Sequence, residues 1–382
     1  MLKTITASFR YELKEIQNSW YKLSLITLLP LVLSILVISI FRSGVVRDMP
    51  LVFVDQDHSR FSRMFASHLN ASPTMEIAYR VDSAKEGVAL VQESKAYGVI
   101  IVPKGFEKNI LLHLQPKVTA MLNTQFILIG KIVTADLTSV VLESAAEIEY
   151  VQSLAETQSP TASLNKVAPV GMQVTPFFNL YKNYFYFLVS ALLPAIWQIF
   201  IVIATLAAIG SLVKEQRTKA FFVNSEKTLA KLIGLVLPYT AVYTFWGILF
   251  LLYMYSIWEF QGSFLILILG IVLTVIAYQS VALFLFIIGF DYARSLSLGA
   301  VYTAPAFAFL GITFPMYNMN GFALFWRDLL PLSHYLQLQI SQANYGANPW
   351  DESGKLIVLA SFSLIMIPVV IRFKSYLRKE FS

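Results

Sequence analysis

The 382 residues of the chain are 57% hydrophobic and only 14% charged, with a mean hydropathy of +0.63, values that exclude a soluble globular protein and indicate several membrane spans. The net charge of +6 does not indicate nucleic acid as a partner, because the cations lie mainly beside apolar runs. The absence of cysteine excludes disulfides and thiol chemistry, and the four histidines lack the spacing of metal ligands.

Residues 1–22 are expected to form an amphipathic helix. Apolar residues recur there at helical spacing, at Leu2, Ile5, Phe9, Leu13 and Ile16. A helix of this kind lies along the cytoplasmic face of the membrane with its apolar side in lipid. It serves either as a simple anchor or as a lever between a cytosolic partner and the first span, and the sequence leaves both roles open.

Residues 23–42 are the first predicted transmembrane helix, close to the roughly 20 residues that a helix needs to cross the hydrocarbon. Pro30 lies inside this run and is expected to kink it. Arg10, Lys14 and Lys22 precede the run. Since Lys and Arg gather on the cytoplasmic side, they favour a cytoplasmic N-terminus.

Residues 43–180 differ in composition, because charge rises and the apolar runs become short. The pattern predicts strands over 51–55, 75–80, 97–102 and 117–124, and helices over 59–69, 83–94 and 125–156. Strands alternating with helices indicate an α/β domain. This domain is inserted between spans one and two, and it is extracytoplasmic if the first span runs from inside to outside.

Residues 181–382 are predicted to be a five-helix transmembrane domain. Its spans are expected over 186–212, 232–257, 264–290, 295–314 and 355–371. An aromatic run at 176–188 precedes them, and it indicates either an interfacial segment or a surface that contacts substrate. The fold class is therefore a polytopic α-helical membrane protein with six transmembrane helices and an extracytoplasmic α/β domain.

The distribution of Lys and Arg predicts that both termini are cytoplasmic. Segments expected inside hold four of them (1–22), five (211–231), one (291–294) and four (372–382). Segments expected outside hold none (258–263) and two (315–355). Short cytoplasmic loops are rich in these residues. The loop 211–231 is thus predicted to be the main polar surface that the membrane half offers to the cytosol, and the contact for a soluble partner.

No catalytic motif is present, since HExxH, GxSxG, CxxC and the phosphate-binding GxxxxGK[ST] are all missing. From Tyr186 onward the interiors of the predicted spans contain no Asp, Glu, Lys or Arg, which argues against ion- or proton-coupled transport. The chain is therefore not expected to be an enzyme. Two hypotheses stay open: a transporter that takes its energy from a soluble partner, and a non-transporting membrane receptor or adaptor-binding protein.

The chain resembles the permeases of type-2 ABC exporters over nearly its whole length. The resemblance is carried by VDQDHSRFSRMFASHLNASP (54–73), YGVIIVPKGFEKNIL (97–111), VKEQRTKAFFVNSEKTLAKLIGLVLPY (213–239) and GITFPMYNMNGFALFWRDLLPLSHYLQLQI (311–340). In that family the cytosolic turn usually reads Glu-(Arg/Lys)-Gly-Thr. Residues 215–218 here read Glu-Gln-Arg-Thr, without the glycine.

The resemblance implies the transmembrane permease subunit of an ATP-driven exporter in the bacterial cytoplasmic (inner) membrane. Such exporters move a hydrophobic or amphipathic substrate outward, such as a drug, a lipid or a glycolipid. Two permease subunits, identical or sister chains, pair with two separate ABC ATPase subunits that bind the ATP, so the permease has no cofactor or metal of its own. Members with a large outer domain often work with a periplasmic adaptor and an outer-membrane channel.

The resemblance also implies where the ATPase acts on the chain. The implied ATPase-coupling residues are Glu215, Arg217 and Thr218 in the loop, with Glu12 and Lys14 on the N-terminal helix. A competing role for these charges is attachment of the loop to anionic membrane lipid headgroups, worth about 1 kcal/mol for each cation.

The predicted topology can be tested with single cysteines, since the chain has none of its own. A cysteine at Ser83 and a cysteine at Ser225 are expected to react with a membrane-impermeant thiol reagent from opposite sides of the membrane. Labelling of both positions from the same side would contradict the topology.

Overall fold

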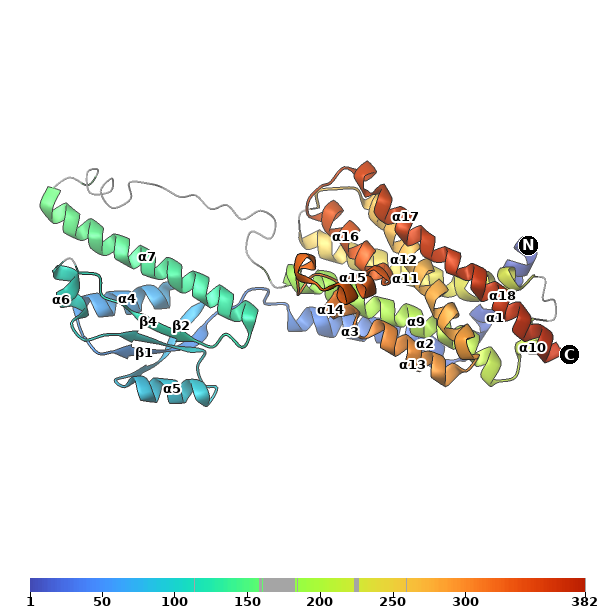
Figure 1. The fold of residues 1–382 in the computed structure, drawn as a ribbon, viewed down its shortest axis with the longest axis horizontal. Coiled ribbons are helices and arrows are strands. Elements are labelled where there is room, and N and C mark those ends of the chain that lie inside the picture. Colours follow the sequence, from blue (N-terminus) through green and yellow to red (C-terminus); the bar gives the residue numbers. More distant parts are fainter. Residues whose placement is uncertain are drawn as a thin grey trace. The chain divides into compact units, whose positions relative to one another are not determined.

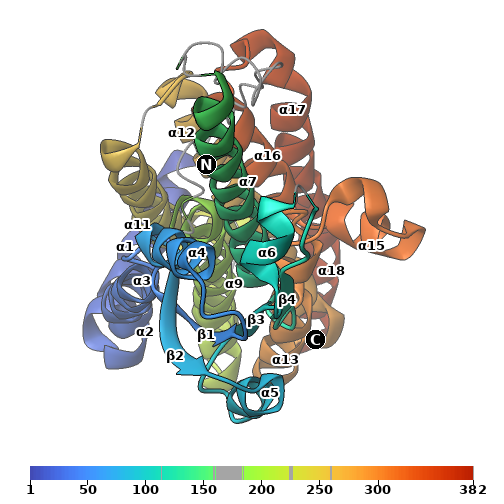
Figure 2. The same ribbon diagram turned by 90° about the vertical axis from the view of Figure 1, so that its left-hand side faces the viewer.

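The computed structural model describes residues 1–112, 114–157, 160, 183, 185–222, 227–258 and 260–381. The predicted aromatic run at 176–188 lies outside the described residues over 176–182 and at 184. The chain divides into two compact units, Met1–Gly44 with Phe177–Ser382 and Val45–Pro176, which are described one at a time. Their elements are labelled in two views (Figure 1 and Figure 2).

The first unit is helical, and five helices within its described residues are long and apolar enough to cross a membrane. They cover Trp20–Ile40, Phe185–Lys214, Thr228–Ile257, Phe264–Gly289 and Pro349–Lys379. The chain is therefore a multi-pass membrane protein, and this part of the prediction is confirmed.

Several of these spans are built from more than one element. The first is α2 (Trp20–Ile26) with α3 (Leu28–Ile40), and the second is a π-helical turn η1 (Phe185–Val189) with α9 (Ser190–Lys214). The third and fourth are α11 (Thr228–Ile257) and α12 (Phe264–Gly289). The last contains η4 (Pro349–Glu352), α17 (Ser353–Ser361), η5 (Phe362–Ile365) and α18 (Met366–Phe381). Two shorter helices, α1 (Leu2–Asn18) and α10 (Thr218–Phe221), flank the spans in sequence.

The span predicted over 295–314 is not one continuous helix. The chain forms α13 (Tyr292–Thr303), is interrupted, and continues as the single turn α14 (Ala306–Phe309). Pro305 lies at the interruption, where it has no N–H to donate to the carbonyl of Val301. The 12 residues of α13 reach only about 18 Å, short of the roughly 30 Å of hydrocarbon. Six spans therefore remain a prediction.

The segment that follows contains further helices. They are η3 (Met316–Asn318), α15 (Gly321–Asp328) and α16 (Pro331–Ala343). Most residues of α16 are buried, and it packs against α12 and α17. Residues 315–354, expected on the outer side as a long re-entry region, thus contribute a helix to the core of the unit.

Pro30 interrupts the first span between α2 and α3, where the sequence predicted a kink. Because proline has no N–H, residue 30 cannot donate to the carbonyl of Ile26, four residues earlier. The indole N–H of Trp246 in α11 donates to that carbonyl instead, over 2.8 Å. The hydroxyl of Tyr243, also in α11, donates to the neighbouring carbonyl of Leu25 over 3.1 Å. The interruption therefore attaches the first span to α11.

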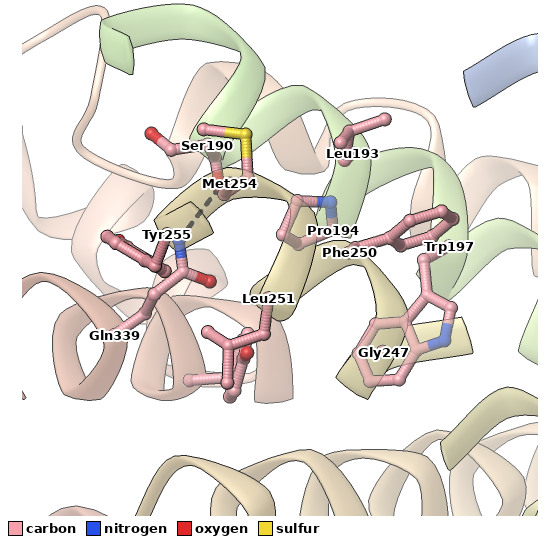
Figure 3. Close-up of a pocket in the computed structure, with 11 residues that line it drawn as sticks. Ser190, Leu193, Pro194, Trp197, Gly247, Phe250, Leu251, Met254, Tyr255 and Gln339 are labelled. Atoms are coloured by element: carbon pink, nitrogen blue, oxygen red, sulfur yellow. Dashed lines mark hydrogen bonds between the residues drawn. The ribbon is translucent and has the colours of Figure 1, made fainter. Parts of the chain in front are cut away.

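Pro194 has the same effect in α9. It leaves the carbonyl of Ser190 without its helical donor, and the side-chain amide of Gln339 in α16 donates to it over 3.1 Å (Figure 3). Beside this bond lies a small cavity of about 20 Å³ between α9, α11 and α16, lined mainly by apolar and aromatic side chains such as Trp197 and Phe250. A cavity of this size holds about one water molecule, so it is a packing feature and not a substrate site in this conformation.

The second unit is built on a four-stranded sheet of order β2-β1-β3-β4. Its strands are β1 (Met49–Asp55), β2 (Met75–Val81), β3 (Gly98–Val102) and β4 (Thr119–Leu122). β1 is parallel to β2 and to β3, and β3 is antiparallel to β4. Its helices are α4 (Arg60–Ala71), α5 (Ala84–Gln92), α6 (Phe106–Leu111) and α7 (Ile127–Thr157). All the strands and helices predicted for this segment are present, and α6 is an addition that was not predicted.

The central strand β1 buries both of its faces, which explains its unbroken apolar run. Side chains alternate between the faces of a strand. Leu51 and Phe53 therefore pack with α4, α6 and α7 on one side, and Val52 and Val54 pack with α5 on the other (Figure 1). Helices on both faces shield the parallel strands from solvent.

Asp57, in the loop after β1, organises one end of the second unit. Its carboxylate accepts hydrogen bonds from the backbone N–H groups of Gly105, Phe106 and Glu107, over 2.7, 3.1 and 2.9 Å. Partial burial works against ionisation of Asp57, but these bonds and one from the Ser59 side chain outweigh it and hold the pKa of Asp57 below its ordinary value. The carboxylate thus joins the start of α6 to the loop after β1.

We expect Trp246→Phe to lower the free energy of unfolding by about 1 to 3 kcal/mol, because the Ile26 carbonyl loses its donor in the membrane. The loss should be smaller in a Pro30→Ala background, where residue 30 regains an N–H. Unfolding of the four variants in denaturing detergent measures the difference, and the double-mutant cycle removes the cost of the smaller ring. An equal loss in both backgrounds would assign the whole effect to ring volume.

Candidate functional site

The predicted site begins where α9 ends, and the end of this helix has a defined backbone geometry. Gln216 adopts a left-handed conformation with φ of +55°. Its N–H donates to the carbonyl of Val213 over 3.1 Å, and the N–H of Arg217 donates to the carbonyl of Leu212 over 2.9 Å. This pair of bonds is a Schellman motif, which satisfies the last carbonyls of a helix.

The missing glycine of the turn has a structural explanation. Arg217, at the position where the family pattern has glycine, has a φ of −89°, a conformation that any L-residue adopts. The left-handed residue is Gln216, one position earlier. The turn therefore forms without glycine at 217.

Thr218 begins α10 and is buried. Its hydroxyl donates to the carbonyl of Leu212 over 3.2 Å. Leu212 thus accepts from the backbone of Arg217 and from the side chain of Thr218. The burial of Thr218 makes it a residue that holds α10 to the end of α9, and not one that contacts a partner directly.

Arg217 joins the loop to the N-terminal helix. Its two Nη atoms donate to the two carboxylate oxygens of Glu15 in α1, each over 2.8 Å, in a bidentate pair. Glu215 makes an ion pair with the same guanidinium, which also lies over the ring of Tyr11 at 5.8 Å. The hydrogen bonds from Arg217 lower the pKa of Glu15 below its ordinary value, in spite of partial burial. α1 and α10 are therefore held together by charge-assisted hydrogen bonds.

The other predicted residues on α1 do not join this cluster. Glu12 is fully buried: it accepts a hydrogen bond from the ammonium of Lys22 over 2.7 Å and one from the hydroxyl of Tyr239 over 2.7 Å. A direct contact between Glu12 and a partner does not fit this burial, so Glu12 is better described as a residue that fixes α1 to α11. Lys14 is exposed, and the structure gives it no part in the Arg217 cluster.

Sequence reasoning missed Glu15 and Tyr11, which supply the contacts to Arg217. Residues four apart on a helix share a face, and Tyr11 and Glu15 have that spacing. This signal showed that the two side chains lie together. It did not show which part of the chain they meet, because that depends on the packing of α1 against α11.

The packing of α1 against α11 is close. A Cβ atom at Gly234 of α11 would stand 2.5 Å from the carbonyl oxygen of Ile5 and 2.6 Å from the Cβ of Ser8. Only glycine allows this approach of the two backbones. The crossing at Gly234 therefore determines where α1 lies and brings Glu15 within reach of Arg217.

A groove of about 400 Å³ lies between α1 and α10, and we call it the α1–α10 groove. It is lined by Thr4, Ala7, Ser8, Tyr11, Arg217, Ala220, Phe221 and Lys231. The ammonium of Lys231 donates to the carbonyl of Phe221 over 2.6 Å and so satisfies the end of α10. It also lies 5.9 and 5.8 Å from the ring centroids of Phe221 and Phe222. The groove thus has a cationic and aromatic lining.

A chain of aromatic contacts continues from the groove into the helices. Ring centroids are 4.9 Å apart between Tyr11 and Phe221, and 4.9 Å between Phe221 and Phe222. Phe222 is fully buried and lies 4.8 Å from Phe373 of α18. The short helix α10 is therefore in contact with α1, α9, α11 and α18, while Lys219 and Ala220 keep one of its sides exposed.

This arrangement supports mechanical contact better than chemistry. Among the described residues there is no group of His, Cys, Asp or Glu that could hold a metal ion. Arg217 is paired with both Glu15 and Glu215, so its positive charge is fully compensated within the cluster. The exposed part of this region is the short helix α10, whose other sides contact α1, α9, α11 and α18.

The comparison with protein families finds one match that spans most of the chain. The family described as ABC-2 family transporter protein matches residues 21–372. The comparison with curated proteins gave no match. The family match agrees with the resemblance drawn from the four sequence stretches.

The pair of Glu15 and Arg217 is expected to stabilise the contact between α1 and α10. We predict that Glu15→Gln and Arg217→Lys each lower the free energy of unfolding, with a coupling energy of about 0.5 to 1.5 kcal/mol in a double-mutant cycle, because both remove the bidentate pair. Unfolding in denaturing detergent is the measurement. The exposed pair Glu93 and Lys95 is the matched control and should give a coupling near zero. Equal coupling for the two pairs would contradict the prediction.

Proposed function

We propose, from the premise that this chain belongs to the ABC-2 transporter family, that it is the permease subunit of an ATP-driven exporter. The observation that carries the proposal is α10, a helix with one exposed side whose other contacts reach α1, α9, α11 and α18. A soluble ATPase that binds this exposed side can move several membrane helices at once. The family in general implies an ABC ATPase partner, and the permease itself is a transporter component and not a catalyst.

The proposed assembly contains two permease subunits and two separate ATPase subunits that bind the ATP. The permease would then have no cofactor of its own. We propose a bacterial inner membrane as the location, with both termini cytoplasmic and six spans. Residues 43–180 would be extracytoplasmic, where a periplasmic adaptor and an outer-membrane channel can complete the path. The distribution of Lys and Arg supports this orientation.

We propose a hydrophobic or amphipathic substrate that moves outward. The interiors of the spans predicted from Tyr186 onward carry no Asp, Glu, Lys or Arg. Intramembrane ionisable residues mark ion and proton pathways. Their absence from these segments supports an apolar route that takes its energy from ATP in a partner.

The coupling mechanism is a rigid-body displacement of α10. Packed elements switch between discrete arrangements and do not bend smoothly. A push on α10 would pass to α9 through the Schellman motif and Thr218, to α1 through Arg217 and Glu15, and to α18 through Phe222. Glu215 and Lys14 are the exposed members of the predicted set and would contact the ATPase, while Glu12 would hold α1 against α11.

Ala220→Trp tests this proposal without a change of charge. Ala220 is exposed on α10 and borders the α1–α10 groove, so a bulky side chain there is expected to block an ATPase sterically. With the cognate ATPase present, we expect ATP hydrolysis stimulated by the permease to fall at least about tenfold, equivalent to roughly 1.4 kcal/mol of lost coupling. Membrane insertion and yield should not change.

The matched control is Glu86→Trp, which places the same side chain on an exposed position of α5 in the other unit. Attachment of the loop to lipid headgroups depends on its cations, which Ala220→Trp leaves intact. Full ATPase stimulation and full co-purification of the ATPase with Ala220→Trp would therefore exclude α10 as the docking element.

A further inference from the structure

Arg327, near the end of α15, is a buried cation whose hydrogen bonds are incomplete. Only 6% of its side chain is exposed, and its one ion-pair partner among the described residues is Asp328, at 3.1 Å from Nη1. Its Nε and Nη2 are buried and have no hydrogen-bond partner within the part of the chain that the structure describes. Arg cannot lose its proton in a protein, so these donors stay charged. Buried charges are ordinarily paired, and this one is paired on one side only.

The two free donors lie on one edge of the guanidinium. Within the planar guanidinium Nη1 is cis to Cδ, so Nε–H and one Nη2–H point in parallel from the opposite edge. This edge is the fork that binds carboxylate or phosphate through two parallel hydrogen bonds. The structure therefore presents an oxyanion-binding edge while Asp328 occupies the opposite side.

The turn that contains Gly311 covers part of this edge. A Cβ atom at Gly311 would stand 3.9 Å from Nε, so the backbone of the 310–316 turn lies against the guanidinium. Gly311 has no side chain and has a φ of +81°. A small shift of this turn away from α15 would open the edge to an oxyanion.

The outer side of α15 is apolar. Phe322, Phe325 and Leu329 are 66%, 61% and 41% exposed. Aromatic contacts with Tyr302, Phe309 and Phe322 surround Trp326, the residue before Arg327. An exposed apolar surface on the same short helix as a charged fork matches a molecule that has an acidic head and an apolar body.

We propose that Arg327 binds the phosphate or carboxylate head of an anionic amphiphile, whose apolar part lies on α15. The oxyanion would accept from Nε and Nη2 together, and the apolar part would cover Phe322 and Phe325. This site is separate from the α1–α10 groove, and binding to it requires no ATPase. It therefore stands or falls independently of the proposed export function.

The test uses the purified full-length chain in an uncharged glycoside detergent with radiolabelled dodecyl phosphate as the probe. We expect saturable binding that weakens by about tenfold or more in Arg327→Lys and in Arg327→Gln, because lysine keeps the charge but not the fork. Arg294→Gln is the matched control, since Arg294 is exposed and the same charge is lost. Asp328→Asn should retain binding, because it leaves the Arg327 edge intact.

Competitors define the ligand class and its source. Dodecanol and inorganic phosphate should each fail to displace the probe, because a competitor needs both an acidic head and an apolar chain. In phosphatidylcholine nanodiscs, displacement of the probe by added phosphatidylglycerol would identify a membrane lipid as the source, and no displacement would identify another acidic amphiphile. Both results support the site.

Two results would overturn the proposal. One is equal binding of the probe to the wild type and to Arg327→Gln. If Arg327→Gln also has a higher melting temperature, the buried guanidinium only lowers the stability of the folded protein. The other is complete displacement by inorganic phosphate. If the Arg327 variants do not fold, the melting temperature of the wild type decides: it should rise with dodecyl phosphate and not with dodecanol, and an equal rise would refute the site.

Discussion

The helical unit depends on one constraint, that a carbonyl without its helical partner finds no water inside a membrane. Proline creates such carbonyls wherever it occurs in a span. Here the carbonyls freed by Pro30 and Pro194 accept from Trp246 of α11 and Gln339 of α16. Each interruption thus becomes a contact between helices. These two contacts join the first span to α11 and α9 to α16.

The polar end of the unit follows a related rule. A helix of four residues such as α10 is not stable alone, because nucleation costs more than so few hydrogen bonds return. Its form is maintained from outside, by the Schellman motif at Gln216, by Thr218, by Lys231 and by the pair of Arg217 with Glu15. The short helix α10 is therefore held at both of its ends by contacts with other elements.

Two buried cations in this chain illustrate different uses of charge. Lys22 and Tyr239 both donate to Oε1 of Glu12, which fixes α1 to α11, while Oε2 of Glu12 is buried without a partner among the described residues. Arg327 has a carboxylate on one side and no partner within the described residues on the other. A buried ion pair fixes the helices that carry it relative to each other. A buried charged edge without a partner lowers the stability of the fold unless another group binds it. This difference separates a structural ion pair from a candidate ligand site.

Much of the architecture could be predicted from the sequence, because it depends on local pattern. Long apolar runs identified the continuous spans, and alternating short runs identified β1 to β4 with α4, α5 and α7. Ser83 caps α5, where its hydroxyl accepts from the N–H of Lys85. The same logic failed at 295–314, since hydropathy does not register that the helix is interrupted at residues 304–305. It also passed over α16, whose polar residues Gln339 and Gln342 are buried against other helices.

The candidate site was predictable only in part. Charge density identified the loop 211–231, and the resemblance added Glu215, Arg217 and Thr218. The sequence alone thus determined the five spans that the described residues contain, the four strands with α4, α5 and α7, and the position of the basic loop, because these depend on local hydrophobic periodicity and charge. The tertiary structure alone decided that Arg217 meets Glu15, 202 positions away in the chain, and that Glu12 is buried instead of exposed. Such contacts follow from the close crossing of α1 and α11 at Gly234, and no local pattern encodes where two distant helices cross.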